Sequence, residues 1–435
     1  MRLIMLTPGA GENFYCENCL RDHALIRHLR RDGHDILMVP MYLPPIPEFD
    51  IETDQPLFFG GINVYLQQKC RLFRHTPRWF DRMLDSPRVL KLAQSMAGMT
   101  RAHDLGETTV SMLRGEEGKQ TKELDRLVAF LSEQEKPDAV CLSNIMLGGL
   151  TPRIREALGA AVVTTAQDED SFLDSLPEPY RSEAWDLLGR RAREVDGLMV
   201  TCEYYRDVMA ERLGLDARDF HVTPNGIDME GYAPAPNGPA EPPRIGFLSP
   251  LSYDKGLDTL LDAFLMLRKR PGLGELKLHL TGGRLASQKD FLRRFADRLD
   301  AEGVTDDVTI FEEFDRKAKI NFLPPLRVLS VPTRMPEASG LYLLEAMACG
   351  VPVVQPDHGV FREILRDTGG GLLYRPGETG ELADALEKLL TDDDLHARLA
   401  CAGRQVVVEK FTIASAASAL TDAINDILHR KGLPR

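Results

Sequence analysis

The sequence predicts an α/β protein built from two Rossmann-like domains that face each other across a cleft. Short apolar or β-branched runs alternate with longer amphipathic stretches along the chain, which is the pattern of βα units around a parallel sheet. The 435 residues exceed one ordinary core of about 150 to 200 residues. Five prolines between residues 233 and 243 separate two sets of strand-like runs. Because such sheets bind ligands outside the carboxyl ends of their strands, two of them predict a shared ligand crevice.

Eleven runs have the length and composition of strands. The first half contributes residues 2–7, 35–40, 139–143, 161–165, 197–201 and 220–223. The second half contributes residues 244–248, 276–281, 308–311, 328–332 and 351–355. The proline-rich residues 233–243 are the predicted linker, because proline is excluded from helix interiors and central strands. Residues 41–118 hold few strand signals and are predicted to elaborate the first domain with a short strand or hairpin followed by helices.

The composition argues against export, membrane spanning and nucleic-acid binding. No stretch approaches the roughly 20 apolar residues of a membrane span, and the first residues lack a signal-peptide core. Seven cysteines, an odd number, favour the reducing cytoplasm over a disulfide framework. A net charge of −13 opposes a broad phosphate-binding surface. A local basic patch remains one interpretation of a group of arginines interleaved with aromatic residues, and it could contact an anionic acceptor or, as a peripheral membrane contact, lipid headgroups. A solvated helix face is the alternative. The arginines are Arg71, Arg74, Arg78, Arg82 and Arg88.

The most informative segment is 336–354, which predicts a strand end, a glycine turn, a helix of about two and a half turns and another strand. Backbone N–H groups near Ser339, Gly340 and Leu341 would form a helix N-terminus, which is a ready anion site. Glu337 and Glu345 flank that N-terminus. Carboxylates accept hydrogen bonds from paired hydroxyls, so Glu345 is expected to bind a ribose and Glu337 a hexose. A surface-helix charge and an ordinary loop carboxylate are the alternatives.

Lys255 lies at a predicted helix start, just after the first strand of the second domain. Leu257, Leu260 and Leu261 begin the helical spacing of that helix. A cation at a helix N-terminus opposes the helix dipole unless an anion is bound there. Lys255 is therefore a candidate phosphate ligand, with a solvated surface lysine as the alternative.

At these residues the chain resembles glycosyltransferase family 4, the retaining enzymes of GT-B fold, whose E-x7-E pattern Glu337 and Glu345 reproduce. Further segments are similar to family motifs: Thr-Pro-Asn-Gly-Ile-Asp at 223–228, Asp-Lys-Gly-Leu at 254–257, Leu-Thr-Gly-Gly at 280–283 and the glycine loop at 9–11. The second-domain motifs cover residues 223–411 in the family's order.

The resemblance implies an acceptor-side domain at 1–235, a donor domain at 244–410 and a helix within 411–435 that crosses back to the first domain. It implies a metal-independent hexosyltransferase without a cofactor. Such an enzyme moves a hexosyl group, with retention, from a nucleoside-diphosphate sugar to a carbohydrate or other hydroxyl acceptor. The acceptor hydroxyl would lose its proton to the departing diphosphate, so no protein nucleophile is required.

The resemblance also assigns roles to single residues. Lys255 and the N–H groups of Gly340 and Leu341 would neutralise the diphosphate, and Gly11 would approach it from the first domain. Glu337 is the catalytic-side carboxylate, Glu345 and Ser339 belong to donor binding, and Arg316 is expected near the base. On the acceptor or sugar side the expected residues are Asn225, Gln167 and Asp168.

Three positions depart from the family's pattern. Pro250 stands where the family has a diphosphate-binding arginine. Gln167 or Asp168 stands in for a sugar-binding histidine, and residues 338–340 read Ala-Ser-Gly in place of Gly-Phe-Gly. These changes keep a second hypothesis open, a non-catalytic nucleotide- or sugar-binding protein of the same fold. Epimerisation or phosphorolysis on a GT-B fold is a third.

Cys16 and Cys19 form a C-x-x-C pair at a predicted helix start. A helix N-terminus lowers thiol pKa, so redox or metal chemistry is one interpretation and a structural or acceptor-loop role is the other. The sequence does not identify the base, the hexose, the acceptor or the oligomeric state.

Overall fold

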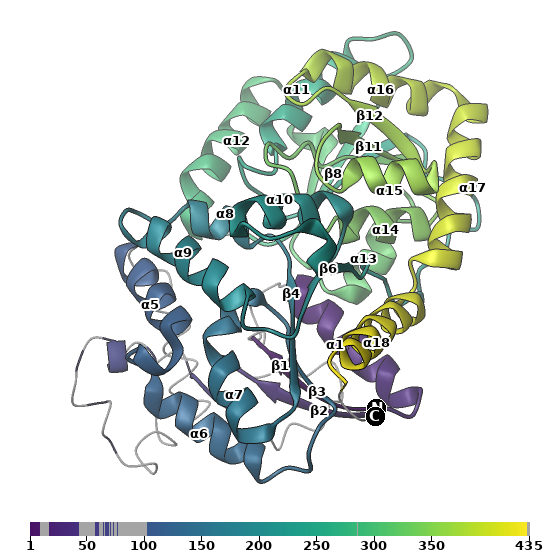
Figure 1. Ribbon diagram of the computed structural model, residues 1–435. Coiled ribbons are helices and arrows are strands. Elements are labelled where there is room, and N and C mark those ends of the chain that lie inside the picture. The colour runs from purple at the N-terminus through teal and green to yellow at the C-terminus, as the bar shows by residue number, and fades with distance from the viewer. Residues whose placement is uncertain are drawn as a thin grey trace. The chain divides into compact units, whose positions relative to one another are not determined.

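The structure is a computed structural model that describes residues 1–8, 17–42, 57–60, 64, 66–68, 70, 73, 76, 102–284 and 286–432 (Figure 1). The chain divides into two compact units. The first contains Met1–Pro224 and Ala416–Arg435, and the second contains Asn225–Ser415.

The first unit is built on a parallel six-stranded sheet in the order β2-β1-β3-β4-β5-β6. Its strands are β1 (Arg2–Thr7), β2 (Asp35–Pro40), β3 (Ala139–Leu142), β4 (Ala161–Ala166), β5 (Gly197–Val200) and β6 (Phe220–Val222). Every residue of β3 and β5 is buried, as expected for strands covered on both faces. Register places Leu3 beside Ala139 and Val140 beside Val162.

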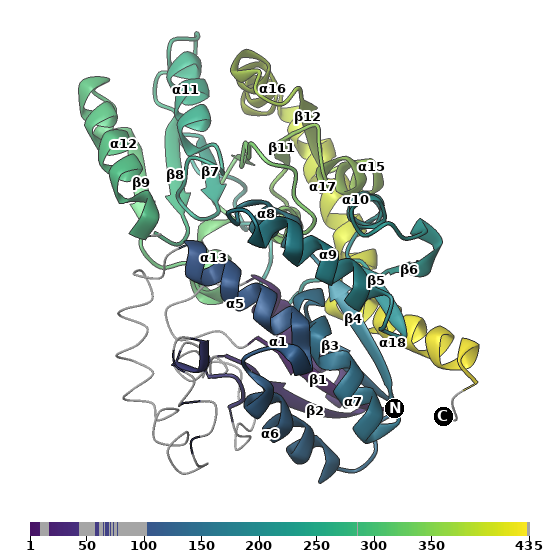
Figure 2. The same ribbon diagram turned by 60° about the vertical axis from the view of Figure 1, so that its left-hand side comes forward.

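Helices surround this first sheet. Among the described residues they are α1 (Glu17–Arg31), α5 (Ala102–Arg114), α6 (Thr121–Ser132), α7 (Thr151–Leu158), α8 (Glu169–Asp174), α9 (Tyr180–Ala192), α10 (Glu203–Leu213) and α18 (Ile413–Arg430). Helix α5 packs on α9, and α6 packs on α7 (Figure 2). Helix α18 fits tightly against β5, since a Cβ on Gly197 would lie 2.2 Å from the Ile427 Cδ1 atom.

The second unit has a parallel sheet in the order β12-β11-β10-β7-β8-β9. Its strands are β7 (Arg244–Leu248), β8 (Lys277–Thr281), β9 (Val308–Phe311), β10 (Val328–Leu329), β11 (Val353–Pro356) and β12 (Gly371–Tyr374). The chain starts in the middle, moves outward to β9, and then returns to β10 on the other side of β7. That return is the topological switch point of a Rossmann sheet.

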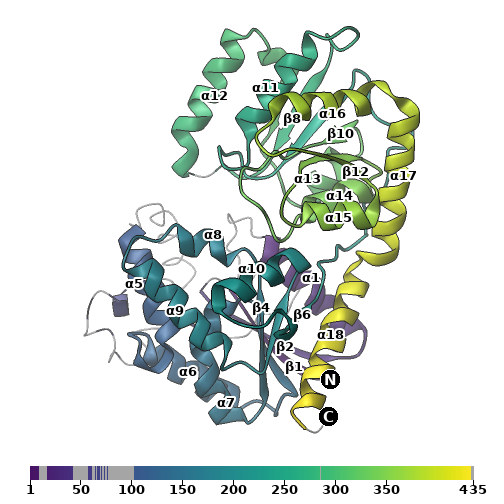
Figure 3. The ribbon, with the colours of Figure 1, turned by 45° about the horizontal axis from the view of Figure 1, so that its top comes forward.

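The helices of the second unit form two groups. Helix α11 (Leu257–Arg268) packs on α16 (Thr379–Thr391), whereas α14 (Leu341–Ala348) and α15 (Phe361–Thr368) both pack on α17 (Asp393–Lys410), as Figure 3 shows. The remaining helices are α12 (Lys289–Ala301) and α13 (Arg316–Phe322).

The predicted α/β class with two Rossmann-like sheets is confirmed, and each of the eleven predicted strands is present. Strand β12 was not predicted. The boundary between the units lies at Pro224 and Asn225, and the proline-rich residues 233–243 lie inside the second unit. The reason is that this segment is anchored there, for example by the Ala240 N–H group, which donates to the Pro325 carbonyl oxygen at 3.0 Å.

Candidate functional site

The candidate site of the second unit lies at the carboxyl edge of its sheet, where β7 and β10 are neighbours. Lys255 follows β7, and Glu337 follows β10. Because the strands are parallel, both loops leave the sheet at the same edge. This switch point is where open α/β sheets bind their ligands.

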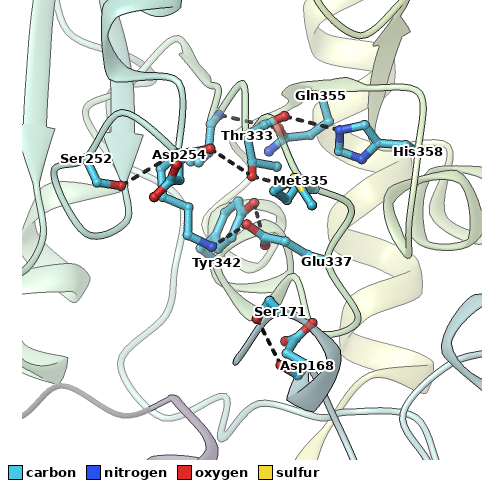
Figure 4. A network of polar contacts seen from close by, with 12 residues as sticks. Asp168, Ser171, Ser252, Asp254, Thr333, Met335, Glu337, Tyr342, Gln355 and His358 are labelled. Carbon is cyan, nitrogen blue, oxygen red and sulfur yellow. Dashed lines mark hydrogen bonds and ion pairs between the residues drawn. The ribbon is translucent and has the colours of Figure 1, made fainter. Parts of the chain in front are cut away.

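Lys255 and Glu337 form an ion pair there. The Lys255 Nζ atom lies 2.5 Å from Glu337 Oε1, and the Tyr342 hydroxyl donates to Glu337 Oε2 at 3.1 Å. Figure 4 shows the Tyr342 ring and the Glu337 carboxylate directed toward one another. The Glu337 side chain is 11% exposed and that of Lys255 is 30% exposed. A ligand can therefore reach the cation while its carboxylate partner stays buried.

The helix N-terminus predicted after Glu337 is present. Gly340 is the N-cap of α14 with φ 62°, a left-handed conformation that glycine adopts without strain. The Asn225 side-chain amide donates to the Ser339 hydroxyl at 3.2 Å. The structure thus brings Asn225, Ser339, Gly340 and Leu341 together at the start of α14, where backbone N–H groups lack helical partners.

Glu345 lies inside a second cluster of buried polar groups. Lys319 Nζ lies 2.8 and 3.0 Å from its two carboxylate oxygens, and the Tyr232 hydroxyl donates to Oε1 at 2.8 Å. Burial raises the pKa of Tyr232, so its hydroxyl stays protonated and remains a donor. The carboxylate predicted for a ribose is thus already paired within the protein, and it retains lone pairs for further donors.

Arg316, which was predicted to lie near the base, forms hydrogen bonds with the backbone just before Tyr232. Its guanidinium donates to the carbonyl oxygens of Asp228 at 3.1 Å and Glu230 at 2.6 Å. It also lies over the Tyr232 ring, 5.5 Å from the centroid. Contact with a base stays a prediction for this residue.

In the first unit, Gln167 and Asp168 follow β4 at the carboxyl edge of the sheet. Gln167 is buried and donates through Nε2 to the Ser143 carbonyl oxygen at 3.2 Å, while its Oε1 accepts from Arg21. Asp168 is the N-cap of α8 with φ 59°. The Ser171 hydroxyl donates to the Asp168 carbonyl at 3.0 Å, so the backbone there is fixed.

Next to Gln167 lies a carboxylate that no motif pointed to. Glu169 is buried, accepts from the Gln167 N–H group at 2.5 Å and from the Tyr205 hydroxyl at 3.0 Å. Burial raises the pKa of Glu169 to about 7. It therefore titrates near neutral pH, and its hydrogen bond with the Gln167 N–H group couples this titration to the loop that carries Gln167.

Several predicted features lie outside the described residues. They are Gly11, Cys16, the arginines 71, 74, 78, 82 and 88, and most of the elaboration at 41–118. Cys19 belongs to α1. In the part of the chain that the structure describes, every helix is too short or too polar to cross a membrane.

Sequence reasoning missed Lys319 and Arg334 of the second unit, and also Tyr232 and Tyr342, whose hydroxyls donate to Glu345 and Glu337. Lys319 is 26 residues from Glu345, and Arg334 is 76 residues from its carboxylate partner Asp258. No spacing rule connects pairs at such distances. Arg334 lies three residues before Glu337, and that proximity to the motif was the one available signal.

Two family models match the chain. "Glycosyltransferase Family 4" matches residues 104–230, and "Glycosyl transferases group 1" matches residues 230–406. Together they cover residues 104–406, which include parts of both units.

Curated relatives agree with these matches. A phosphatidyl-myo-inositol mannosyltransferase of Mycobacterium leprae is 32% identical over 49% of this chain and 55% of its own length. A D-inositol 3-phosphate glycosyltransferase of Stackebrandtia nassauensis is 29% identical over 60% of each chain. A GDP-mannose-dependent mannosyltransferase of Mycobacterium tuberculosis, which acts on phosphatidylinositol monomannoside, is 28% identical over 63% of this chain and 71% of its own. The chain thus spans a little over half the length of the first two relatives.

Solved structures share the fold at low identity. Sucrose-phosphate synthase from Thermosynechococcus elongatus has a TM-score of 0.73 at 17% identity and covers 99% of both chains. Anabaena HepE in complex with UDP and glucose has a TM-score of 0.71 at 17% identity over 98% of this chain and 99% of its own. With the family models and the Glu337 to Glu345 spacing, the conclusion follows that the chain belongs to glycosyltransferase family 4.

Proposed function

We propose that this protein is a retaining glycosyltransferase that moves a hexosyl group from a nucleoside-diphosphate sugar to an acceptor hydroxyl. The observation that carries the proposal is the Lys255–Glu337 ion pair at the β7/β10 switch point, beside the N-terminus of α14. A diphosphate is an anion that would compete with Glu337 for the Lys255 ammonium group. The N–H groups of Gly340 and Leu341 add further donors for it.

The mechanism needs charge stabilisation more than covalent chemistry. As the donor bond breaks, negative charge grows on the departing diphosphate, and Lys255 with the α14 N-terminus is placed to stabilise it. Glu337, released from Lys255, can accept hydrogen bonds from hexose hydroxyls while Tyr342 keeps it oriented. The acceptor proton leaves with the diphosphate oxygen, so the scheme needs no protein nucleophile, cofactor or metal.

Donor binding is tested first by thermal shift with UDP, GDP, ADP, GDP-mannose and UDP-glucose. GDP-mannose is included because one relative is GDP-mannose-dependent. At about 100 times its dissociation constant a ligand stabilises the fold by about 2.7 kcal/mol. We expect one nucleotide to stabilise the wild type and Lys255→Ala to lose that effect.

Lys277→Ala is the matched control. Lys277 is 29% exposed and forms a 2.6 Å ion pair with Asp307, but it opens β8 at the amino edge of the same sheet. Its loss should leave nucleotide binding unchanged. Absence of stabilisation by every nucleotide at millimolar concentration would remove the donor site from the proposal.

Turnover is tested by release of the nucleoside diphosphate. The acceptor panel contains myo-inositol, inositol phosphates and phosphatidylinositol vesicles, because the relatives' names contain these groups. We expect Glu337→Gln to lower the rate by about 10² to 10³, activity to persist in EDTA, and product NMR to show the donor's anomeric configuration.

The remaining hypotheses predict other results. Nucleotide binding without turnover on any acceptor would favour a non-catalytic binding protein, consistent with Pro250 in place of arginine. An altered nucleotide sugar would indicate epimerisation, and a requirement for inorganic phosphate would indicate phosphorolysis.

A further inference from the structure

Within the second unit, the loop that carries Lys255 lies directly against the loop that carries Glu337. The Asp254 carbonyl oxygen accepts from the Arg334 N–H group at 2.9 Å and from the Thr333 hydroxyl at 3.4 Å. Figure 4 shows Thr333 lying between Asp254 and His358. A Cβ on Gly256 would lie 1.9 Å from the Pro332 carbonyl oxygen, so the two backbones pass each other without room for a side chain.

The Arg334 side chain joins the same two loops a second time. Its guanidinium donates to both carboxylate oxygens of Asp258, at 3.0 and 2.9 Å, and to the Thr259 hydroxyl at 3.1 Å. It also donates to the Tyr253 carbonyl oxygen and lies over the Tyr253 ring, 3.8 Å from the centroid. The backbone and the side chain of Arg334 together thus form hydrogen bonds with residues 253, 254, 258 and 259.

These contacts decide which role Arg334 can play. The missing arginine at position 250 suggests that another arginine supplies charge to the diphosphate. Both terminal nitrogens of Arg334 already make two hydrogen bonds each, and its charge is balanced by the bidentate Asp258 carboxylate. A guanidinium held in this way is committed to the loop and is not available as a phosphate ligand.

We propose that Arg334 is a positioning residue, which with Asp258 holds Lys255 and Glu337 at the separation that the donor site requires. Lys255 immediately follows Asp254, and Glu337 lies three residues after Arg334. If the contacts between Arg334 and residues 253–259 are lost, both Lys255 and Glu337 are therefore displaced. A misplacement of about 1 Å can cost about 10²-fold in rate. The link to donor chemistry rests on the proposed function, whereas the link to the position of Lys255 does not.

The test measures the accessibility of Lys255 directly. Full-length protein is labelled briefly with limiting acetic anhydride, and acetylation of each lysine is quantified by mass spectrometry. The variants are Arg334→Lys, which keeps the charge but loses the forked geometry, and Asp258→Asn. The matched control is Arg270→Lys, because Arg270, two residues after the end of α11, also binds two carboxylates, Asp384 and Glu387 of α16.

We expect labelling of Lys255 to rise about tenfold in Arg334→Lys, which corresponds to about 1.4 kcal/mol in the exposure of that amine. A smaller rise is expected in Asp258→Asn and no change in Arg270→Lys. Labelling of Lys277 and Lys410 should stay constant, because global loosening would raise all lysines together. Where the wild type binds a nucleotide, kcat should fall more than nucleotide affinity.

Unchanged Lys255 labelling in Arg334→Lys overturns the proposal. So does a rise shared by all lysines with a lowered melting temperature. If the wild type binds no nucleotide but labelling of Lys255 alone rises, the proposed function fails and the positioning role stands. If the wild type binds a nucleotide but labelling of Lys255 does not change in Arg334→Lys, the positioning role fails and the proposed function stands.

Discussion

At the scale of single residues, the two motif glutamates have the same kinds of partner but different surroundings. Glu337 is paired with a lysine and a tyrosine hydroxyl, and so is Glu345. The Lys255 side chain is 30% exposed, whereas that of Lys319 is 5% exposed. A ligand can therefore replace the first pairing, while the second is part of the folded core.

Loss of Lys319 should destabilise the second unit. Lys319→Met leaves the Glu345 carboxylate buried without its cation, which typically costs about 3 to 5 kcal/mol. Lys319→Met combined with Glu345→Leu should recover most of that loss, because no buried charge is left unpaired. Urea unfolding followed by hydrogen exchange in the second unit measures both. A single variant as stable as Lys277→Met would contradict this account.

Glu169 should make the first unit less stable as pH rises. Burial raises its pKa from 4.5 to about 7, so the folded unit binds this proton more tightly than the unfolded chain. The stabilisation from protonation is complete below pH 4.5 and is lost as pH rises through about 7, a change of about 3 kcal/mol. Glu169→Gln should flatten this dependence in melting curves between pH 5 and 8.

The control for this titration is Glu211→Gln, which removes an exposed carboxylate of the same unit. It should retain the wild-type dependence on pH. If the melting temperature of Glu169→Gln depended on pH as strongly as that of the wild type, the titrating group would be a residue other than Glu169.

At the scale of elements, two glycines with similar backbone conformations distinguish the cost of left-handed backbone strain from the cost of a steric clash. Gly256 has φ 71° and a backbone oxygen 1.9 Å from the position of a Cβ, whereas Gly272 has φ 80° and no atom within 4 Å. Gly272→Ala should cost about 1 to 2 kcal/mol from left-handed strain alone. Gly256→Ala should cost clearly more and abolish nucleotide-induced thermal shifts. Equal losses in the two variants would mean that the loops can separate freely.

Most elements were predictable because local patterns specify them. Alternating apolar runs located eleven of the strands, and the glycine turn located the start of α14. Strand β12 escaped because Gly371–Tyr374 has four residues and directly follows glycines, which reads as a turn. The linker was predicted from proline content, which reports local stiffness, whereas residues 225–243 make contacts with distant parts of the second unit that leave no local pattern.

The site was predictable only where it follows a motif. Glu337, Glu345, Lys255 and the α14 N-terminus were found by spacing, and the structure places the first three in polar clusters of one unit. Lys319 and Arg334 escaped because ion pairs between distant positions leave no periodic trace. The roles of all these site residues in ligand binding and catalysis stay predictions, and so do those of Arg316, Gln167, Asp168, Asn225 and Gly11.

At the scale of the whole molecule, the chain passes from the first unit to the second and returns. Helix α18 completes the first unit, and its residues Ile424, Ile427 and Leu428 are buried. Ile427→Ala should cost about 2 to 5 kcal/mol through a cavity beside Gly197. We expect hydrogen exchange to accelerate in the first unit while nucleotide binding by the second is retained. Faster exchange spread equally over both units would contradict this.

The matched control for this whole-molecule prediction is Leu389→Ala, because Leu389 is fully buried in α16 of the second unit. In Leu389→Ala, hydrogen exchange should accelerate in the second unit and stay unchanged in the first. The comparison therefore measures whether the two cores lose stability separately.

The return of the chain also has a consequence during synthesis. Residues 225–415 lie between the two parts of the first unit, and at about 5 to 20 residues per second their translation takes about 10 to 40 s. Until Ile427 emerges from the ribosome, β5 lacks the contact that Gly197 makes with α18. We expect the nascent first unit to bind chaperones during this interval, and a premature stop before α18 to release a chain whose first unit is permanently incomplete.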